Sequence, residues 1–249
     1  MTEKNPIAYP VFAAYCSQFT VHSYNSPAAL RRAMKSAAEP WPILEPEHLS
    51  EPIDRVDSVD VPRLLALQER KTGEWHQTSF VPSGTGLLEL IEEEHRCNFE
   101  LWHDEDKARR DDQGYEFVYR AKRNIDHWNQ RRNDCIERID IWFAERSPAF
   151  PEGTPMNSET PGMIIDRLSI LALKEYHMAE EAERPGAPEA QRARSQEKLS
   201  IIRQQRSNLA SALDEMLALI ARGTRGFRVY YQFKMYNDPA LNPEIYRNR

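Results

Sequence analysis

Polar side chains that could do chemistry recur at helical spacing in two long segments of the chain. In the first segment, steps of three and four residues bring four of them onto one stripe, because a helix turns about 100° per residue: His95, Asn98, Glu105 and Arg109. In the second segment the same spacing aligns carboxylates, amides and a cation: Lys122, Asp126, Asn129, Asn133, Glu137 and Asp140. Apolar residues flank both stripes, so these polar groups fall on the face that an amphipathic helix normally buries.

A third segment has charged residues embedded in a helix that is apolar on nearly every side. Asp166, Arg167 and Lys174 lie within or directly after a stretch rich in isoleucine and leucine. Such a helix is typical of a buried, central position. Burying an unpaired charge costs several kcal/mol, so these charges must pair with one another or meet a ligand. The simplest arrangement points the three polar stripes at one another.

This pattern predicts a site that combines a divalent cation with an anionic ligand. Carboxylate and amide oxygens suit Mg²⁺, and we expect Glu137 and Asp140 to hold it, with Glu105 and Asp126 beside them. His95 is the predicted general acid or base, so the predicted catalytic groups are His95, Glu105 and Asp126. Cationic side chains suit phosphate, which favours a phosphorylated sugar or a nucleotide-sugar. The predicted ligand-binding residues are Asn98, Arg109, Lys122, Asn129, Arg132, Asn133, Asp166, Arg167 and Lys174.

Two alternatives to this enzyme reading stay open. The stripes can form a purely structural ion-pair network in a non-catalytic accessory protein. Near-complete internal pairing would favour that alternative, whereas an open cleft with unpaired acids would favour an enzyme. Glu92-x-x-His95 and Glu100-x-x-His103 also match the spacing of di-iron ligands, but both pairs lie on one segment, which argues against a di-iron bundle.

Long helices must position these residues, and the sequence predicts an all-α fold. The helical segments span about 85–110, 115–146, 161–183 and 189–222, with Pro and Gly breakers between them. A shorter helix is expected over about 62–76, and another over about 27–38. We therefore predict an irregular N-terminal segment, 1–60, and a four-helix bundle domain, 61–249, that ends in an extended aromatic tail from residue 227.

Composition excludes several classes of protein. The 249 residues include 33 Lys and Arg against 39 Asp and Glu, a net charge of −6, which disfavours general nucleic-acid binding. No apolar run is long enough to span a membrane. Three scattered cysteines and the lack of a signal-peptide pattern indicate a cytoplasmic protein. The aromatic tail is expected to cover the bundle or a partner subunit, so a homo-oligomer is possible.

Three motifs and the tail resemble the bacterial family called domain of unknown function 4254. The motifs begin at His95-x-x-Asn98, at Ile125-Asp126-x-x-Asn129 and at Ser158-Glu159-Thr160-Pro161-Gly162, and the tail matches at Gln232-Phe233-Lys234-Met235-Tyr236. The resemblance covers about residues 60–245. It implies a setting beside glycosyltransferases of surface-polysaccharide assembly, hence a role in envelope glycan synthesis and a glycosyltransferase partner. It implies no reaction and assigns no residue a role.

Overall fold

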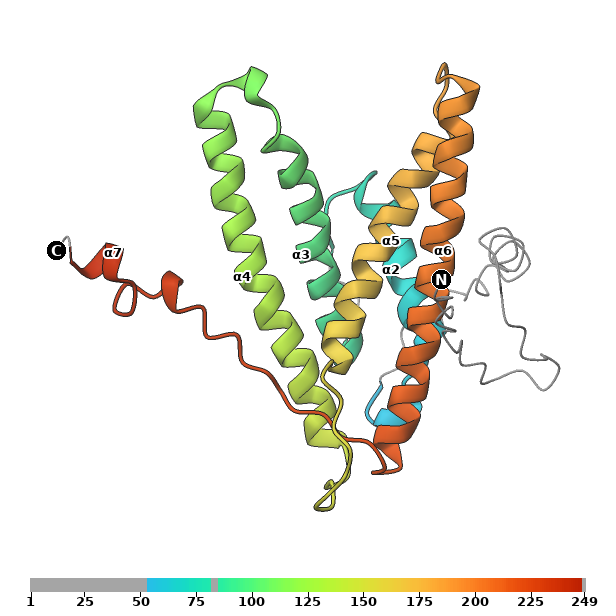
Figure 1. Cartoon of the computed structure of the whole chain (residues 1–249), viewed down its shortest axis with the longest axis vertical. Helices are drawn as coiled ribbons and strands as arrows, with labels where there is room; N and C mark the ends of the chain where they lie inside the picture. The colour runs from blue at the N-terminus through green and yellow to red at the C-terminus, as the bar shows by residue number, and fades with distance from the viewer. Residues whose placement is uncertain (1–52, 82–84, 248–249) are drawn as a thin grey trace, which may run out of the picture. The chain divides into compact units, whose positions relative to one another are not determined.

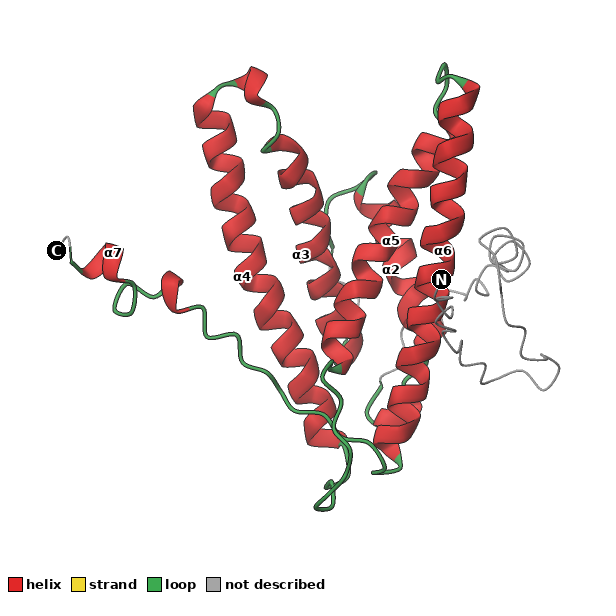
Figure 2. Ribbon diagram, viewed as in Figure 1, coloured by secondary structure: helices red, strands yellow, loops and turns green. Residues whose placement is uncertain are grey.

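The computed structural model describes residues 53–81 and 85–247 (Figure 1). Helices and loops make up this part of the chain, and it contains no strand (Figure 2). The predicted all-α class is therefore confirmed. The short helix expected over 27–38 lies outside the described residues, and the division at residue 60 stays a prediction. No helix in the described ranges combines the length and apolar character needed to cross a membrane.

The main helices begin and end close to where the sequence predicts them. They are α2 (Val61–Trp75), α3 (Leu87–Lys107), α4 (Tyr115–Arg146), α5 (Pro161–Glu183) and α6 (Glu189–Ala221). Short helices are η2 (Val56–Ser58), η3 (Asp111–Gln113), η4 (Met235–Asn237) and α7 (Pro243–Tyr246). Thr160 caps α5, because its hydroxyl accepts a hydrogen bond from the Met163 amide at 3.2 Å. Proline follows as the first residue of that helix, where its missing amide hydrogen is not needed.

Two helix pairs build the bundle. The pairs are α3 with α4 and α5 with α6, and α2 packs against α5 and α3 (Figure 1). One apolar core joins all five helices, and its largest fully buried side chains include Leu64, Leu88, Ile139, Phe143, Ile165 and Leu213. A second, smaller cluster lies between α3 and α4 alone: Leu101, Ala108, Ala121 and Ile125. Each fully buried large side chain contributes roughly 1.5–3 kcal/mol.

The C-terminal tail leaves α6 and runs along α4. It first pairs with the loop between α4 and α5, where the Asn157 amide donates to the Gly226 carbonyl at 2.7 Å. Further on, the Gln232 amide donates to Glu137 Oε1 at 2.8 Å, and Asn237 donates to Gln130 at 2.8 Å. These contacts hold the tail against α4 through its backbone and its polar groups.

Candidate functional site

Side chains from α3, α4 and α5 meet in a buried hydrogen-bonded network that contains four predicted site residues: His95, Asn98, Arg132 and Asp166. The Asn98 amide nitrogen lies 2.9 Å from Asp166 Oδ1 and 3.0 Å from Ser169 Oγ. From α4, Arg132 places Nη1 3.5 Å from Asn98 Oδ1 and Nε 3.7 Å from Asp166 Oδ1. Asn98 is only 4% exposed, so losing a partner here would cost about 1–3 kcal/mol.

His95 is enclosed at the base of this network. Thr72 Oγ1 donates to the Gln68 carbonyl at 2.8 Å and therefore accepts from His95 Nε2–H at 2.9 Å. The other ring nitrogen, Nδ1, then accepts from the Ser169 hydroxyl at 2.7 Å. Burial lowers the pKa of His95 to about 3, so its ring is neutral at physiological pH. His95 Nδ1 could accept a proton only after the hydrogen bond from Ser169 had broken. The catalytic role of His95 stays a prediction.

Glu94 is a member of this network that the sequence pattern did not single out. Its carboxyl is fully buried, with Oε1 2.5 Å from the Asn98 amide nitrogen. Burial, and next the neighbouring Asp166, raise the pKa of Glu94 well above its ordinary value. The acidic run that contains Glu94 resembles a solvated face, yet Glu92 is also buried, 3.1 Å from Lys71 Nζ. The spacing of four residues between Glu94 and Asn98 was the available signal.

The two predicted magnesium ligands both contact the protein itself. Asp140 is 2% exposed, and its Oδ1 accepts from the Gly162 amide at 2.7 Å, at the start of α5. Burial raises the pKa of Asp140 to about 6, although hydrogen bonds from Thr160 and Gly162 oppose that shift. Glu137 accepts from the tail amide of Gln232. Their role as metal ligands stays a prediction.

Replacing Asp140 with asparagine should change how stability depends on pH. The folded protein keeps the Asp140 proton up to about pH 6, whereas the unfolded chain releases it near pH 3.8. Ionisation in this window therefore favours unfolding, and the wild type loses stability as the pH rises through it. Asparagine cannot ionise but can still accept from Gly162. Its stability relative to the wild type should rise by on the order of 2 kcal/mol between about pH 4 and about pH 7.

Urea unfolding of both proteins across this pH range measures the difference. Other titrating groups, His95 among them, act on both proteins alike and cancel in the comparison. A difference that stays constant with pH would show that Asp140 is ionised at a normal pKa.

The other predicted residues of the first two stripes lie near the surface. Glu105 Oε2 is 2.7 Å from Arg109 Nη1 and 3.8 Å from Lys122 Nζ, which links α3 to α4. Asp126 is exposed and pairs with Arg123 of its own helix. The Asn129 carbonyl accepts from Lys234 of the tail at 3.3 Å, and Asn133 is half-buried. These residues stand outside the buried network.

The remaining two predicted ligand-binding residues, Arg167 and Lys174, line a shallow groove between α5 and α6. The amides Gln205 and Asn208 line it with them, above an apolar floor that includes Leu171 and Leu209. Its volume is about 580 Å³. Arg167 also pairs with Glu159, at 2.5 Å. The groove could hold an anionic ligand with an apolar or sugar-like body.

Three histidines that were not predicted together also meet. His76 follows α2, His103 lies on α3 and His177 on α5. Because the three come from three different helices, no spacing in the sequence could relate them.

Comparison with models of known protein families identifies the family of this chain. The model of the family described as "Protein of unknown function (DUF4254)" matches residues 88–229, more than half of the chain. The chain belongs to this family. No curated protein and no solved structure matches the chain.

The DUF4254 match spans α3 to α6 and the start of the tail. It therefore includes the network residues Glu94, Asn98, Arg132 and Asp166, whereas α2 and its His76 precede it. Three of the four helices that contribute side chains to the network, α3, α4 and α5, thus lie in the DUF4254 region. The fourth helix, α2, contributes Thr72.

Proposed function

We propose that this protein is a non-catalytic accessory protein that binds a glycosyltransferase of bacterial envelope glycan synthesis through its C-terminal tail. One observation carries the proposal: beyond the buried Phe227, the tail holds seven large apolar side chains out in solvent. The exposed set is Tyr230, Tyr231, Phe233, Met235, Tyr236, Leu241 and Ile245. Clustered exposed apolar residues mark interaction sites, and aromatic side chains and methionine are enriched at protein interfaces.

The backbone of the tail supports the same conclusion. Phe233 is 78% exposed and has a φ of 35°, in the left-handed region that bulky residues rarely adopt. Holding this conformation costs on the order of 1 kcal/mol or more, which burial within this chain does not repay. A partner that covers the ring would repay it.

The pairing of the polar stripes also favours an accessory protein over an enzyme. Asp166 and Arg132 face each other, Asp140 is bonded to the start of α5, and Glu105 is paired with Arg109. Among the described residues, the predicted acids thus have partners within the chain. A network of this kind fixes how α3, α4 and α5 pack, which supports a structural role.

Serine substitutions in the tail test the proposal. The double variant Tyr231→Ser, Phe233→Ser should lose at least about tenfold in affinity for a glycosyltransferase of envelope glycan synthesis from the same bacterium, because buried aromatic anchors dominate interfaces. Binding is measured with the two purified proteins. Tyr115→Ser is the matched control, since Tyr115 is 83% exposed but begins α4.

Equal binding by the tail variant and the control would overturn the proposal. A tail variant that instead changes the oligomeric state in light scattering would replace the glycosyltransferase with a second copy of this chain.

A second candidate function is binding of a phosphorylated sugar or nucleotide-sugar in the α5–α6 groove. The convergence of Arg167 and Lys174 favours it, because phosphate needs cationic partners. A thermal-shift screen with nucleotide-sugars, with and without Mg²⁺ or Mn²⁺, tests it. A ligand at about a hundred times its Kd adds roughly 2.7 kcal/mol of stability. Lys174→Ala should remove the shift and Lys198→Ala, on α6, should keep it; no shift with any ligand would reject this candidate.

A further inference from the structure

We propose that His76, His103 and His177 bind a divalent transition-metal ion of the zinc class through their Nε2 atoms. This site is independent of the tail and of the proposed partner. It also differs from the magnesium site expected from the carboxylates, since its ligands are three imidazoles.

The three histidines converge from three helices. His76 caps the C-terminal end of α2, His103 lies in the last turns of α3, and His177 lies in the second half of α5. One ring nitrogen of each lies within 4.8 Å of those of the other two. Nitrogen ligands at about 2.0–2.1 Å from a tetrahedral ion are separated by roughly 3.4 Å, so small side-chain rotations would close the site.

Hydrogen bonds at Nδ1 fix the same tautomer in all three rings. His76 Nδ1 lies 2.7 Å from the Thr72 carbonyl, and His103 Nδ1 lies 2.8 Å from the Phe99 carbonyl. His177 Nδ1 lies 3.0 Å from Glu180 Oε2. Carbonyl and carboxylate oxygens accept, so each Nδ1 carries the hydrogen and each Nε2 keeps its lone pair. Histidines that bind metals nearly always donate their second ring N–H to such an acceptor.

The Nε2 atoms of His76 and His177 are buried and have no hydrogen-bond partner within the described part of the chain. A buried acceptor without a partner is uncommon, because it has lost water and gained nothing in return. Two such atoms in one cluster, each on a ring whose other nitrogen is engaged, point to a shared ligand. A cation that accepts both lone pairs would satisfy them.

Aromatic rings hold the imidazoles in place. Tyr176 stacks on His76 with ring centroids 4.3 Å apart, and Trp102 stacks on His177 at 4.8 Å. Phe99 meets the rings of His76 and His103 at 4.9 and 4.4 Å. A shell of this kind controls how water reaches the three Nε2 atoms.

The ligand set selects the class of ion. Neutral imidazoles suit Zn²⁺, Cu²⁺, Ni²⁺ and Fe²⁺, whereas Mg²⁺ prefers oxygen. Three protein ligands leave the fourth tetrahedral position for a water molecule.

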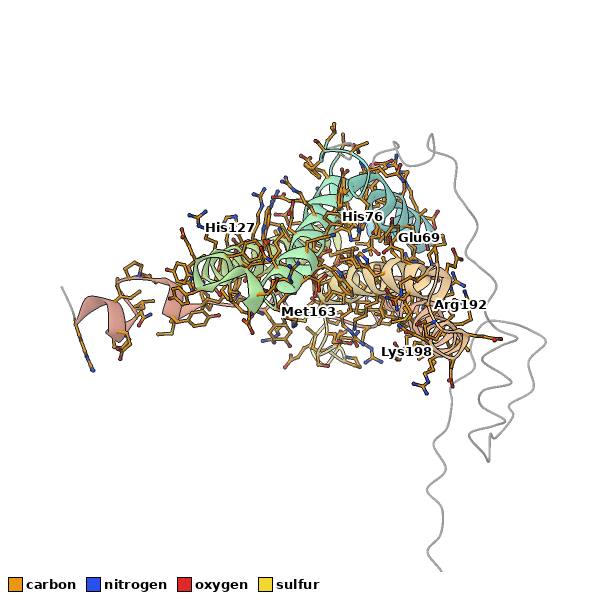
Figure 3. All side chains as sticks on the ribbon, turned by 90° about the horizontal axis from the view of Figure 1, so that it is seen from above. Glu69, His76, His127, Met163, Arg192 and Lys198 are labelled. Carbon is orange, nitrogen blue, oxygen red and sulfur yellow. The ribbon has the colours of Figure 1, made fainter. Side chains whose placement is uncertain are left out.

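Titration of the full chain with Co²⁺ and Zn²⁺ tests the proposal. The protein carries no histidine tag and is stripped with a chelator first. We expect one equivalent of Co²⁺ to give the intense visible absorption of tetrahedral coordination, and Zn²⁺ to displace it. His103→Gln should weaken binding by at least ~100-fold. His127→Gln is the matched control, because His127 is exposed on α4 and lies apart from His76 (Figure 3).

Glu180→Gln tests the hydrogen bond behind His177. Glu180 is exposed and is not one of the three proposed ligands, so it acts only by positioning the ring of His177. Loss of such a partner weakens metal binding by about 10–100-fold, a change that a merely structural ion pair would not produce. Circular dichroism confirms that each variant is folded. The proposal fails if the wild type binds no stoichiometric metal, or if His103→Gln and His127→Gln bind it equally.

Discussion

Replacing Arg206 with methionine should lower the free energy of unfolding by about 3 kcal/mol. Arg206 is 2% exposed in α6 and joins three helices. Its Nη2 donates to the Leu65 carbonyl of α2 at 3.0 Å, and its Nη1 contacts Glu69 of α2 and, at 3.2 Å, Glu175 of α5. Methionine keeps much of the volume but removes the Arg206 donor from the Leu65 carbonyl and from Glu69, and it leaves Glu175 with Arg203 alone.

Chemical denaturation of the two proteins measures this loss. Arg203→Met is the control, because Arg203 pairs with the same Glu175 at 2.7 Å but is about half exposed. An exposed ion pair contributes about 0–1 kcal/mol, so the control should stay close to the wild type. Equal losses in both variants would mean that burial of Arg206 adds nothing to its contacts.

Replacing Gly162 with alanine should destabilise the protein by about 3 kcal/mol. A Cβ at this position would lie 2.7 Å from Asp140 Oδ1 and 2.8 Å from the Ile136 carbonyl. Both atoms belong to α4, and the backbone carbonyl cannot rotate away. The start of α5 would have to move off α4, which would also stretch the bond from the Gly162 amide to Asp140.

The same substitution at Gly73, Gly73→Ala, should instead raise the stability of the protein. Gly73 lies inside α2, and nothing stands within 4 Å of a Cβ built there. Alanine is a better helix former than glycine, so this variant should gain about 0.5–1 kcal/mol. The two variants share one chemical change and differ only in their surroundings. No loss at Gly162 would contradict the close packing of α4 on α5, and a loss at Gly73 would contradict the open space described beside α2.

The helices were predictable because their ends are marked locally. Gly114 precedes α4 with a φ of 86°, and Pro148 follows its end. Thr160 and Pro161 mark the start of α5 in the same way. Such signals act within a few residues, so a single sequence is enough to find them.

The buried network was predictable in part. His95, Asn98 and Asp166 stood out because polar groups on an apolar helix face must find partners. The same rule could not show how much of α3 and α4 is covered by α5. Glu105 and Asp126 lie where α3 and α4 pair around the small cluster of Leu101 and its neighbours, and there the stripes meet solvent.

The histidine cluster and Glu94 were beyond the reach of periodicity. His76, His103 and His177 come from separate helices, so only the tertiary packing relates them. Glu94 follows two other glutamates, and charge runs of this kind normally face water. Its burial depends on the position of α5, which supplies Asp166.

Thr72 touches both histidine environments of the bundle. Its carbonyl accepts from the ring of His76, and its hydroxyl accepts from the ring of His95. An ion that withdraws electrons from His76 would strengthen the first of these bonds and shift the α2 backbone on which the second depends. The ¹⁵N resonances of His95, a residue far too enclosed to meet any ion itself, would then serve as a remote spectroscopic gauge of occupancy.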